Sequence, residues 1–373
     1  MSVEPNVQRR VVTGIEQITS TWLTSVLNGS YLAENDSVVS CNGNQIAVGE
    51  GFAGRLYRLH LTFTEAPPAT LIAKMATDHE PLKKILNETM LYREARFYER
   101  IASLVSIDIP KVYYTAYGDG ELVIIMEDLG EIELGLDVQE ATVAESEKAL
   151  ACIAKFHTQW WNHEMIEKEW VAPVNDSVDR EEIARSIEAS LLKHGDRFPY
   201  LAKCMRVFLK KFPKLPEEIP QPWPLTLIHG DFHRKNVHFR DDGSVIIFDW
   251  QVLERNTPIT DIANWLLVNL NIEDRQSHEY RLLRHYYDSL SEECTSAYSF
   301  RKLKADYRQA LVLTAVRDFA ILELVDLDIE GGEELSLVML ARVEQAARDH
   351  RLLIMFRSLG LTILLLRIQN LFR

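Results

Sequence analysis

The chain has 373 residues, of which 47% are hydrophobic and 26% charged, a composition typical of a folded globular protein. Its formal net charge of -14 argues against nucleic acid as the main partner, because phosphate backbones are bound by basic surfaces. No stretch approaches the roughly 18 uncharged apolar residues that a membrane-spanning helix needs. The four cysteines are spaced too widely for a zinc site or a disulfide framework. We therefore predict a cytoplasmic protein that binds neither nucleic acid nor membranes.

The first 128 residues have the pattern of a small α+β lobe. Apolar residues recur every three or four positions over residues 8–28, which predicts a leading helix. Alternating apolar residues, turn signals and one long helical pattern follow. The predicted elements, in chain order, are strands over 45–48, 55–63 and 70–75, a helix over about 82–103, and strands over 112–116 and 122–126.

A glycine-rich run joins the first two predicted strands. Gly49, Gly51 and Gly54 match the pattern Gly-x-Gly-x-x-Gly, which also occurs in dinucleotide-binding folds and is weak by itself. The residues after Gly54 alternate like a strand, whereas a dinucleotide fingerprint opens a helix. The context favours a kinase phosphate loop, in which glycine lets backbone N–H groups approach phosphates. A dinucleotide-dependent enzyme is the alternative.

Lys74 lies in the apolar run 71–75, Leu-Ile-Ala-Lys-Met. This run is similar to the Val-Ala-Ile-Lys strand of kinases, whose lysine pairs with the α and β phosphates of ATP. The alternative is an edge-strand lysine that faces water. In the first role the lysine needs a carboxylate on the next helix, and we predict Glu94, with Glu88 as the second candidate.

An apolar strand that ends at Met126 predicts the hinge between two lobes. The Met126 side chain would back the adenine ring, and backbone groups of Glu127 and Leu129 would bind its edge. We predict a nucleotide-binding lobe over 1–128 and a catalytic and acceptor-binding lobe over 129–373. The second lobe is mostly helical, with predicted helices over 141–161, 180–194 and 201–212 and about four more after residue 260.

The most informative run is 229–236, His-Gly-Asp-Phe-His-Arg-Lys-Asn, which is followed after a predicted hairpin by Asp249. Phosphoryl transfer needs a carboxylate near the acceptor hydroxyl, and an amide oxygen and a second carboxylate to hold Mg²⁺ on the phosphates. Asp231, Asn236 and Asp249 supply this set, at the spacing of a kinase catalytic loop. The competing interpretation is structural, because Asp and Asn are common in turns.

Together these motifs resemble the aminoglycoside phosphotransferase and choline kinase superfamily, particularly its ecdysteroid-kinase-like branch, over residues 45–270. The residues that carry the resemblance are 49–54, Lys74, Glu94, 126–129, 154–157, 229–236, 249–251 and 261–263. The resemblance implies an α+β, bilobal protein-kinase-like fold. Its N-terminal lobe would be a small antiparallel β-sheet with one main helix, and its C-terminal lobe would be larger and α-rich.

The resemblance also implies an activity, in which the γ-phosphate of ATP moves to a hydroxyl group of a small molecule with Mg²⁺ bound. It implies that Asp231 orients or deprotonates this hydroxyl and that Asn236 and Asp249 are Mg²⁺ ligands. It further implies that Lys74 and Glu94 clamp the phosphates of ATP.

Two departures from protein kinases favour a small-molecule acceptor. Asp249 is followed by Trp-Gln instead of Phe-Gly, and eleven residues separate it from Asp261, too few for an activation loop. The family implies that Asp261 braces the catalytic loop. Arg234 and Lys235 make this loop more basic than is common in the family. They either neutralise charge on the γ-phosphate or form a solvated surface pair.

Two other functions compete with a small-molecule kinase, namely a catalytically inactive nucleotide-binding scaffold and, less favoured, a protein kinase. The sequence does not select the acceptor or an oligomeric state, and aminoglycosides, choline-like amines, macrolides and sterols all fit. Candidate acceptor-binding carboxylates are Glu273, Asp318, Glu323 and Asp326. His157, Trp160 and Trp161 lie on an apolar helix and are interpreted as core residues.

Overall fold

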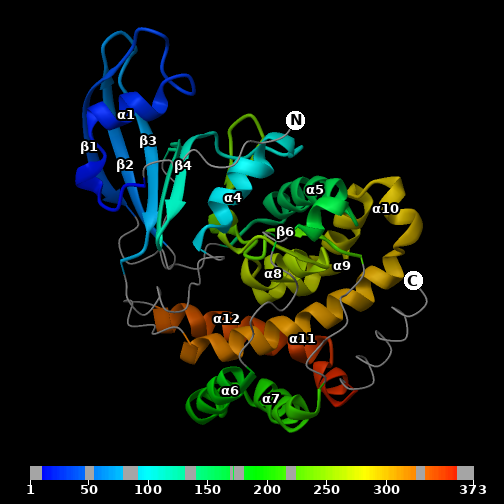
Figure 1. Cartoon of the computed structure of the whole chain (residues 1–373). Coiled ribbons are helices and arrows are strands. Elements are labelled where there is room, and N and C mark those ends of the chain that lie inside the picture. The colour runs from blue at the N-terminus through cyan, green and yellow to red at the C-terminus, as the bar shows by residue number, and fades with distance from the viewer. Residues whose placement is uncertain are drawn as a thin grey trace. The chain divides into compact units, whose positions relative to one another are not determined.

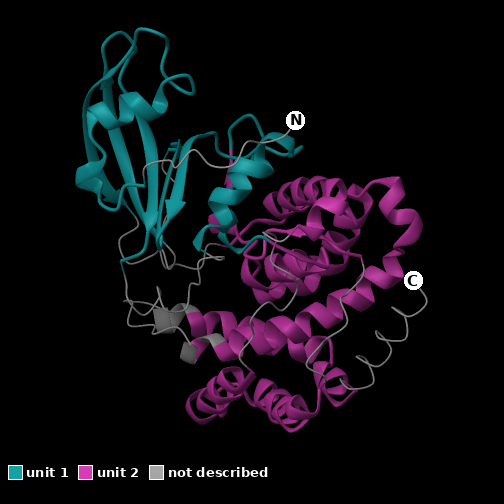
Figure 2. Ribbon diagram, viewed as in Figure 1, with its two compact units in different colours: residues 1–135, 240–253 teal, residues 136–239, 254–373 magenta. Residues whose placement is uncertain are grey.

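The computed structural model describes residues 11–46, 54–78, 91–130, 140–168, 171, 180–215, 224–324 and 332–358. The chain forms two compact units, one made of residues 1–135 and 240–253 and the other of 136–239 and 254–373 (Figure 2). Along the sequence, the chain thus leaves the first unit after residue 135, returns to it at residues 240–253, and then continues in the second unit. The predicted division into 1–128 and 129–373 contains no such return.

The first unit is built on a five-stranded sheet (Figure 1). Its strands are β1 Val38–Ile46, β2 Gly54–Phe63, β3 Ala69–Ala76, β4 Val112–Gly118 and β5 Glu121–Glu127. They lie in the order β1-β2-β3-β5-β4, and each neighbouring pair is antiparallel. The predicted α+β fold class with a small antiparallel sheet is confirmed.

Strand β1 differs from its prediction. A strand was expected over 45–48, whereas β1 runs from Val38 to Ile46, and residues 47 and 48 lie outside the described part. The centre of β1 reads Ser-Cys-Asn-Gly-Asn, which lacks the alternation of a half-buried strand. β1 is an edge strand, and its extended conformation is stabilised more by backbone pairing with β2 than by burial of its side chains.

The predicted leading helix over 8–28 is wrong in its extent. Residues 1–10 lie outside the described part, and the rest contains a 3-10 turn at Ile15–Gln17 and helix α1 at Ser20–Leu27. The hydroxyl of Thr19 accepts a hydrogen bond from the N–H of Trp22 at 3.2 Å. This N-cap starts a new helix and divides the segment in two.

Helix α4, Arg93–Arg100, connects the sheet to the returning segment 240–253. Part of the helix predicted over 82–103, including Glu88, lies outside the described residues. The rings of Phe97 and Trp250 stack with their centroids 4.4 Å apart and 16° between their planes, and both side chains are fully buried. This contact holds the short strand β8 (Val245–Ile247) and the 3-10 turn Trp250–Val252 in the core of the first unit.

The second unit is mostly helical. Its helices are α5 Val143–Gln159, α6 Arg180–His194, α7 Pro199–Lys211, α8 Ile259–Val268, α9 Ile272–Ser289, α10 Glu292–Ala297, α11 Phe300–Leu324 and α12 Gly332–Asp349. Its strands are β6 Thr226–Ile228, β7 Val237–Phe239 and β9 Glu254–Asn256. Helix α5 packs on α9, and α11 packs on both α6 and α8 (Figure 1). These helices confirm the predicted α-rich character of this part.

None of the described helices combines the length and the apolar character that crossing a bilayer requires. The cysteines Cys41, Cys152, Cys204 and Cys294 are all free thiols.

Candidate active site

Lys74 forms a buried charge cluster in the first unit. It lies on the inner strand β3 and is 7% exposed, so the alternative of an edge-strand lysine facing water is wrong. Its Nζ is 2.6 Å from Oε2 of Glu94 and 2.6 Å from Oδ1 of Asp249. The structure thus contains the pair of Lys74 with Glu94, and the role of this pair toward phosphates stays a prediction.

The cluster holds one cation and two carboxylates, and their charges shift each other's pKa. Burial raises the pKa of Glu94 to about 6, an effect that Lys74 opposes and Asp249 reinforces. Burial would lower the pKa of Lys74, but Asp249 and Glu94 raise it above its usual value. Lys74 therefore stays charged, and the excess of negative charge suits an additional cation.

The raised pKa of Glu94 predicts how the stability of the protein depends on pH. Because the folded state binds this proton more tightly than the unfolded state, the contribution of Glu94 to stability is full below pH 4.5 and declines as the pH rises to about 6. We expect the free energy of unfolding of wild type, relative to Glu94→Gln, to fall by about 1–2 kcal/mol over this window. Urea unfolding of both proteins at several pH values measures it. A constant or rising difference would refute the shift.

Asp249 has an unusual backbone conformation. Its φ of 66° and ψ of 62° place it in the left-handed region, which non-glycine residues seldom adopt. The next residue, Trp250, is buried, and its Nε1 donates to the carbonyl of Ile247 at 3.2 Å. The Asp249 side chain is 27% exposed. An accessible carboxylate on a strained backbone next to Lys74 is typical of a functional site.

At Gly54, the last residue of the glycine-rich run, only glycine fits without a steric clash. Gly54 begins β2, and a Cβ at this position would lie 2.7 Å from the carbonyl oxygen of Met75 on β3. Gly49 and Gly51 lie outside the described residues. Because a strand and not a helix follows Gly54, the local structure argues against a dinucleotide fingerprint.

The segment after β5 is held by an arginine on β2. Arg58 donates from Nε to Oδ2 of Asp128 at 2.8 Å and from Nη2 to the carbonyl of Gly130 at 2.6 Å. Met126, near the end of β5, is buried. The predicted hinge is thus fixed to its own sheet by charge-assisted hydrogen bonds.

The backbone of Glu127 is partly used within the sheet. Its N–H donates to the carbonyl of Lys111 at 2.8 Å, and its side chain accepts from the N–H of Lys111 at 3.0 Å. The N–H of Glu127 therefore already has a partner in the protein, and the binding of adenine by backbone groups of Glu127 and Leu129 stays a prediction.

In the second unit, the loop 229–236 after β6, which the sequence predicts to be catalytic, is braced by a buried carboxylate. Asp261 on α8 is fully buried and accepts the N–H of His229 at 2.8 Å and that of Gly230 at 2.9 Å. Nε2 of His157 lies 3.2 Å from Oδ2 of Asp261, and Nδ1 of His157 lies 2.9 Å from the hydroxyl of Tyr286. The implied brace is present, and His157 is a core residue as predicted.

Substitution Asp261→Asn should destabilise the second unit. The amide can replace one carboxylate oxygen but leaves one buried N–H of the loop without an acceptor, which costs about 1–3 kcal/mol. Chemical denaturation measures the change in the free energy of unfolding. Asp196→Asn, at an exposed position after α6, is the matched control and should change stability by less than about 0.5 kcal/mol. Equal stabilities for the two variants would contradict the brace.

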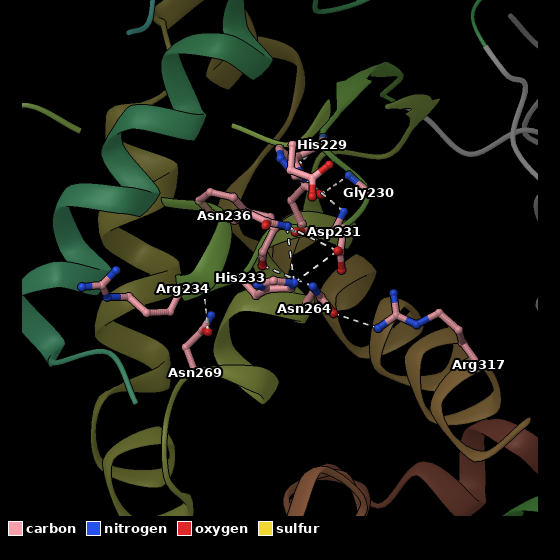
Figure 3. Close-up of polar contacts among 12 residues, drawn as sticks. His229, Gly230, Asp231, His233, Arg234, Asn236, Asn264, Asn269 and Arg317 are labelled. Carbon is pink, nitrogen blue, oxygen red and sulfur yellow. Dashed lines mark hydrogen bonds and ion pairs between the residues drawn. The ribbon is translucent and has the colours of Figure 1, made fainter. Parts of the chain in front are cut away.

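Asp231 is at the centre of this loop (Figure 3). Its Oδ2 is 3.1 Å from Nε2 of His233, and Nδ2 of Asn236 donates to its carbonyl at 2.9 Å. Burial would raise the pKa of Asp231, but His233, together with His229 and Arg317, holds it well below its usual range. Asp231 is therefore ionised at neutral pH and can orient or accept the proton of a hydroxyl group.

The predicted metal ligands have the donor chemistry of a magnesium site. Since Nδ2 of Asn236 faces Asp231, the amide oxygen is the atom left for a cation. Asp249 adds an accessible carboxylate. Within the described part of the chain, no group of three or more His, Cys, Asp or Glu residues could hold a metal. Mg²⁺ usually takes one or two carboxylates together with phosphate and water oxygens. The role of Asn236 and Asp249 as its ligands stays a prediction.

The side chain of Arg234 points away from Asp231 (Figure 3). Its Nη1 donates to the carbonyl of Val237 at 2.9 Å, and its Nη2 is 3.3 Å from Oε1 of Glu145. Its guanidinium also lies 4.8 Å from the ring centroid of Phe239. These contacts support a structural role for Arg234 over neutralisation of the γ-phosphate.

Sequence reasoning missed two residues beside the loop, Asn264 and Arg317. Nδ2 of Asn264 donates to the carbonyl of Phe232 at 3.2 Å, and Nη2 of Arg317 donates to Oδ1 of Asn264 at 2.7 Å. The spacing of Asn264 three residues after Asp261, on one helix face, was the available signal. Asp318, one of the predicted acceptor-site candidates, accepts from Nε of Arg317 at 2.8 Å. Of the other candidates, Glu273 is exposed and the side chains of Glu323 and Asp326 lie outside the described part.

The chain is similar to several known proteins. The model of the ecdysteroid kinase-like family matches residues 48–298. An uncharacterised kinase-like protein of Caenorhabditis elegans is 31% identical over 88 residues, which are 23% of this chain and 23% of that protein. The solved structures that share the fold include two phosphotransferases. One is the GDP complex of an aminoglycoside 2'-phosphotransferase (14% identity, TM-score 0.51, covering 94% of this chain and 98% of that one). The other is a spectinomycin phosphotransferase with ADP and spectinomycin (12%, 0.52, 88% and 99%).

Proposed function

The chain belongs to the ecdysteroid kinase-like family, and on this basis we propose that it transfers the γ-phosphate of ATP to a hydroxyl group of a small molecule. The observation that carries the proposal is the state of Asp231. The loop holds this carboxylate ionised next to His233 and Asn236, as a group that receives the proton of an alcohol must be.

The proposed reaction is a direct transfer. Asp231 orients the acceptor hydroxyl. The oxygen of this hydroxyl attacks the γ-phosphorus, and one carboxylate oxygen of Asp231 takes its proton. The new O–P bond forms while the bond to the bridging oxygen breaks, and ADP leaves with that oxygen. Asn236 and Asp249 would hold Mg²⁺, which neutralises charge on the phosphates.

Lys74 and Glu94 are assigned to the ATP phosphates. Lys74 is charged, and Glu94 and Asp249 hold its ammonium group, which lowers the entropy cost of binding a phosphate there. The N–H of Leu129 and the carbonyl of Glu127 would bind the edge of the adenine ring, with Met126 behind it. The phosphate loop at Gly49 and Gly51 belongs to the proposal from sequence alone.

The two competing functions make different predictions. An inactive scaffold is disfavoured because Lys74, Asp231, Asn236 and Asp249 are all retained. A protein kinase is disfavoured by the eleven residues between Asp249 and Asp261. A scaffold would bind ATP without turnover, and a protein kinase would label protein substrates.

The test is acceptor-dependent consumption of ATP. Purified protein is incubated with MgATP and a panel of hydroxylated small molecules, and phosphorylated product is identified by mass spectrometry together with ADP release. Turnover that needs both Mg²⁺ and an acceptor is the expected result. Binding of ATP with no product from any acceptor would favour the scaffold.

A further inference from the structure

Helix α4 carries a buried tyrosine, Tyr98, whose hydroxyl group forms no hydrogen bond with any residue that the structure describes. Its side chain is 8% exposed. Two other tyrosines of the same unit have partners, since the hydroxyl of Tyr92 accepts the N–H of Gly120 at 2.7 Å and that of Tyr117 donates to Glu99 at 3.1 Å. A buried polar group without a partner destabilises a protein, so the hydroxyl of Tyr98 needs an explanation.

Tyr98 lies next to Glu94 on α4. The two residues are four positions apart, a spacing that puts them on one helix face with their Cβ atoms about 5–6 Å apart. A long side chain in a helix leans toward the preceding turn, which here carries Glu94. Burial raises the pKa of the Tyr98 phenol well above its usual range, and the charges of Glu94 and Asp249 add to this effect. The hydroxyl group is therefore a permanent donor beside the charge cluster of Lys74, Glu94 and Asp249.

Aromatic packing holds the ring of Tyr98 in place. It contacts the ring of Phe97 edge to face, with the centroids 5.3 Å apart and 70° between the planes. Phe97 in turn stacks on Trp250, the residue that follows Asp249. Because closely packed rings seldom change rotamer, the hydroxyl group stays inside the unit. The acceptors within its reach are those of the charge cluster.

The proposed binding of ATP changes the demands on this cluster. The ammonium group of Lys74 has three donors, and Glu94 and Asp249 lie 2.6 Å from it. In the complex, the phosphates of ATP accept from the same ammonium group, while Asp249 turns to Mg²⁺. Glu94 is 2% exposed, and besides Lys74 it accepts from the backbone N–H of Trp250. Since a buried carboxylate needs several donors, sharing Lys74 with phosphates leaves Glu94 in need of another.

We propose that Tyr98 is a positioning residue, whose hydroxyl group donates to the carboxylate of Glu94 when the phosphates of ATP share Lys74. It thereby fixes Glu94 as the partner of the lysine in the complex. Tyr98 touches neither ATP nor the metal and acts through Glu94 alone. Its hydroxyl group is unpaired in the free protein and paired in the complex, so the hydrogen bond contributes to ATP affinity. The inference rests on the proposed function and adds a residue to its ATP-binding part.

The test is Tyr98→Phe, which removes the hydroxyl group and keeps the ring. Affinity for MgATP, measured by calorimetric titration, should fall at least about tenfold, the low end for loss of a hydrogen bond to a charged group. The urea midpoint of the nucleotide-free protein should stay equal or rise, because an unpaired buried group is removed. A purely structural tyrosine gives the opposite pair, a lower midpoint with unchanged affinity, and that result would overturn the inference.

Tyr117→Phe is the matched control, because it removes a hydroxyl group that already has a partner on α4. It should leave the affinity for MgATP unchanged. In a Glu94→Ala background, Tyr98→Phe should change the affinity less than about twofold further, since the acceptor is gone. A full tenfold loss in that background would disprove action through Glu94. Wild type that binds no ATP would contradict the proposed function and the inference with it, whereas equal binding by wild type and Tyr98→Phe would overturn the inference alone.

Discussion

Replacement of Asp231 by asparagine is expected to lower kcat at least about a hundredfold, the low end of the contribution of a positioned base. The amide has nearly the same shape and can keep the contacts with His233 and Asn236 that position this residue. It cannot accept a proton from the acceptor hydroxyl. Affinity for ATP should change little, because the residues assigned to ATP lie elsewhere in the chain.

The measurement combines initial rates at saturating acceptor with calorimetric titration of nucleotide. Asp241→Asn, at an exposed turn position ten residues later, is the matched control and should keep the rate of wild type. An unchanged kcat in Asp231→Asn would remove this residue from the role of base. A large loss of nucleotide affinity would show that the substitution acts on binding and not on proton transfer.

The parts of the site that the sequence predicted are those fixed by local pattern. Lys74 could be placed on a strand because apolar residues surround it, and Glu94 followed from the next helical pattern. Asp231 and Asn236 lie in one loop five residues apart, so their proximity is a matter of chain geometry. The contact between Nδ2 of Asn236 and Oδ2 of Asp231 at 3.3 Å could therefore be predicted without knowledge of the tertiary structure.

The parts that the sequence did not predict depend on tertiary contacts. Segment 240–253 belongs to the first unit because Trp250 stacks on Phe97, and neither residue signals the other in the sequence. Arg317 comes close to the loop 229–236 because α11 packs on α8, which carries Asn264. A lone arginine on a long helix has no local pattern that distinguishes it from a solvated one.

Two elements of the fold were predicted with the wrong bounds, and each error has a local cause. Apolar residues recur at helical spacing over residues 8–28, but the N-cap at Thr19 begins a separate helix within this range. Hydrophobic periodicity alone does not reveal such a helix boundary. Strand β1 has few apolar residues, and its pairing with β2 compensates for the missing pattern. Periodicity is therefore a weaker guide at edges and caps than in the core.

Replacement of Asp249 by alanine should weaken Mg²⁺-dependent binding of ATP at least about tenfold, the low end of the effects of residues that support a bound metal. The change removes the carboxylate proposed as a Mg²⁺ ligand and one of the two partners of Lys74. Titration of ATP with and without Mg²⁺ measures the effect as a ratio of two affinities. Affinity equal to wild type in the presence of Mg²⁺ would count against the assignment.

Alanine at this position also has a backbone cost, because the φ of 66° is unfavourable for a residue with a Cβ and no local hydrogen-bonding group. Asp249→Asn separates the two effects, since asparagine tolerates the left-handed region and keeps the shape of the side chain. If Asp249 binds Mg²⁺ through its charge, both variants lose the Mg²⁺-dependent part of ATP affinity. If the residue only shapes the turn before Trp250, asparagine behaves as wild type and alanine alone is impaired. A loss in both variants, with binding of metal-free ATP retained, is the result that the proposed role of Asp249 requires.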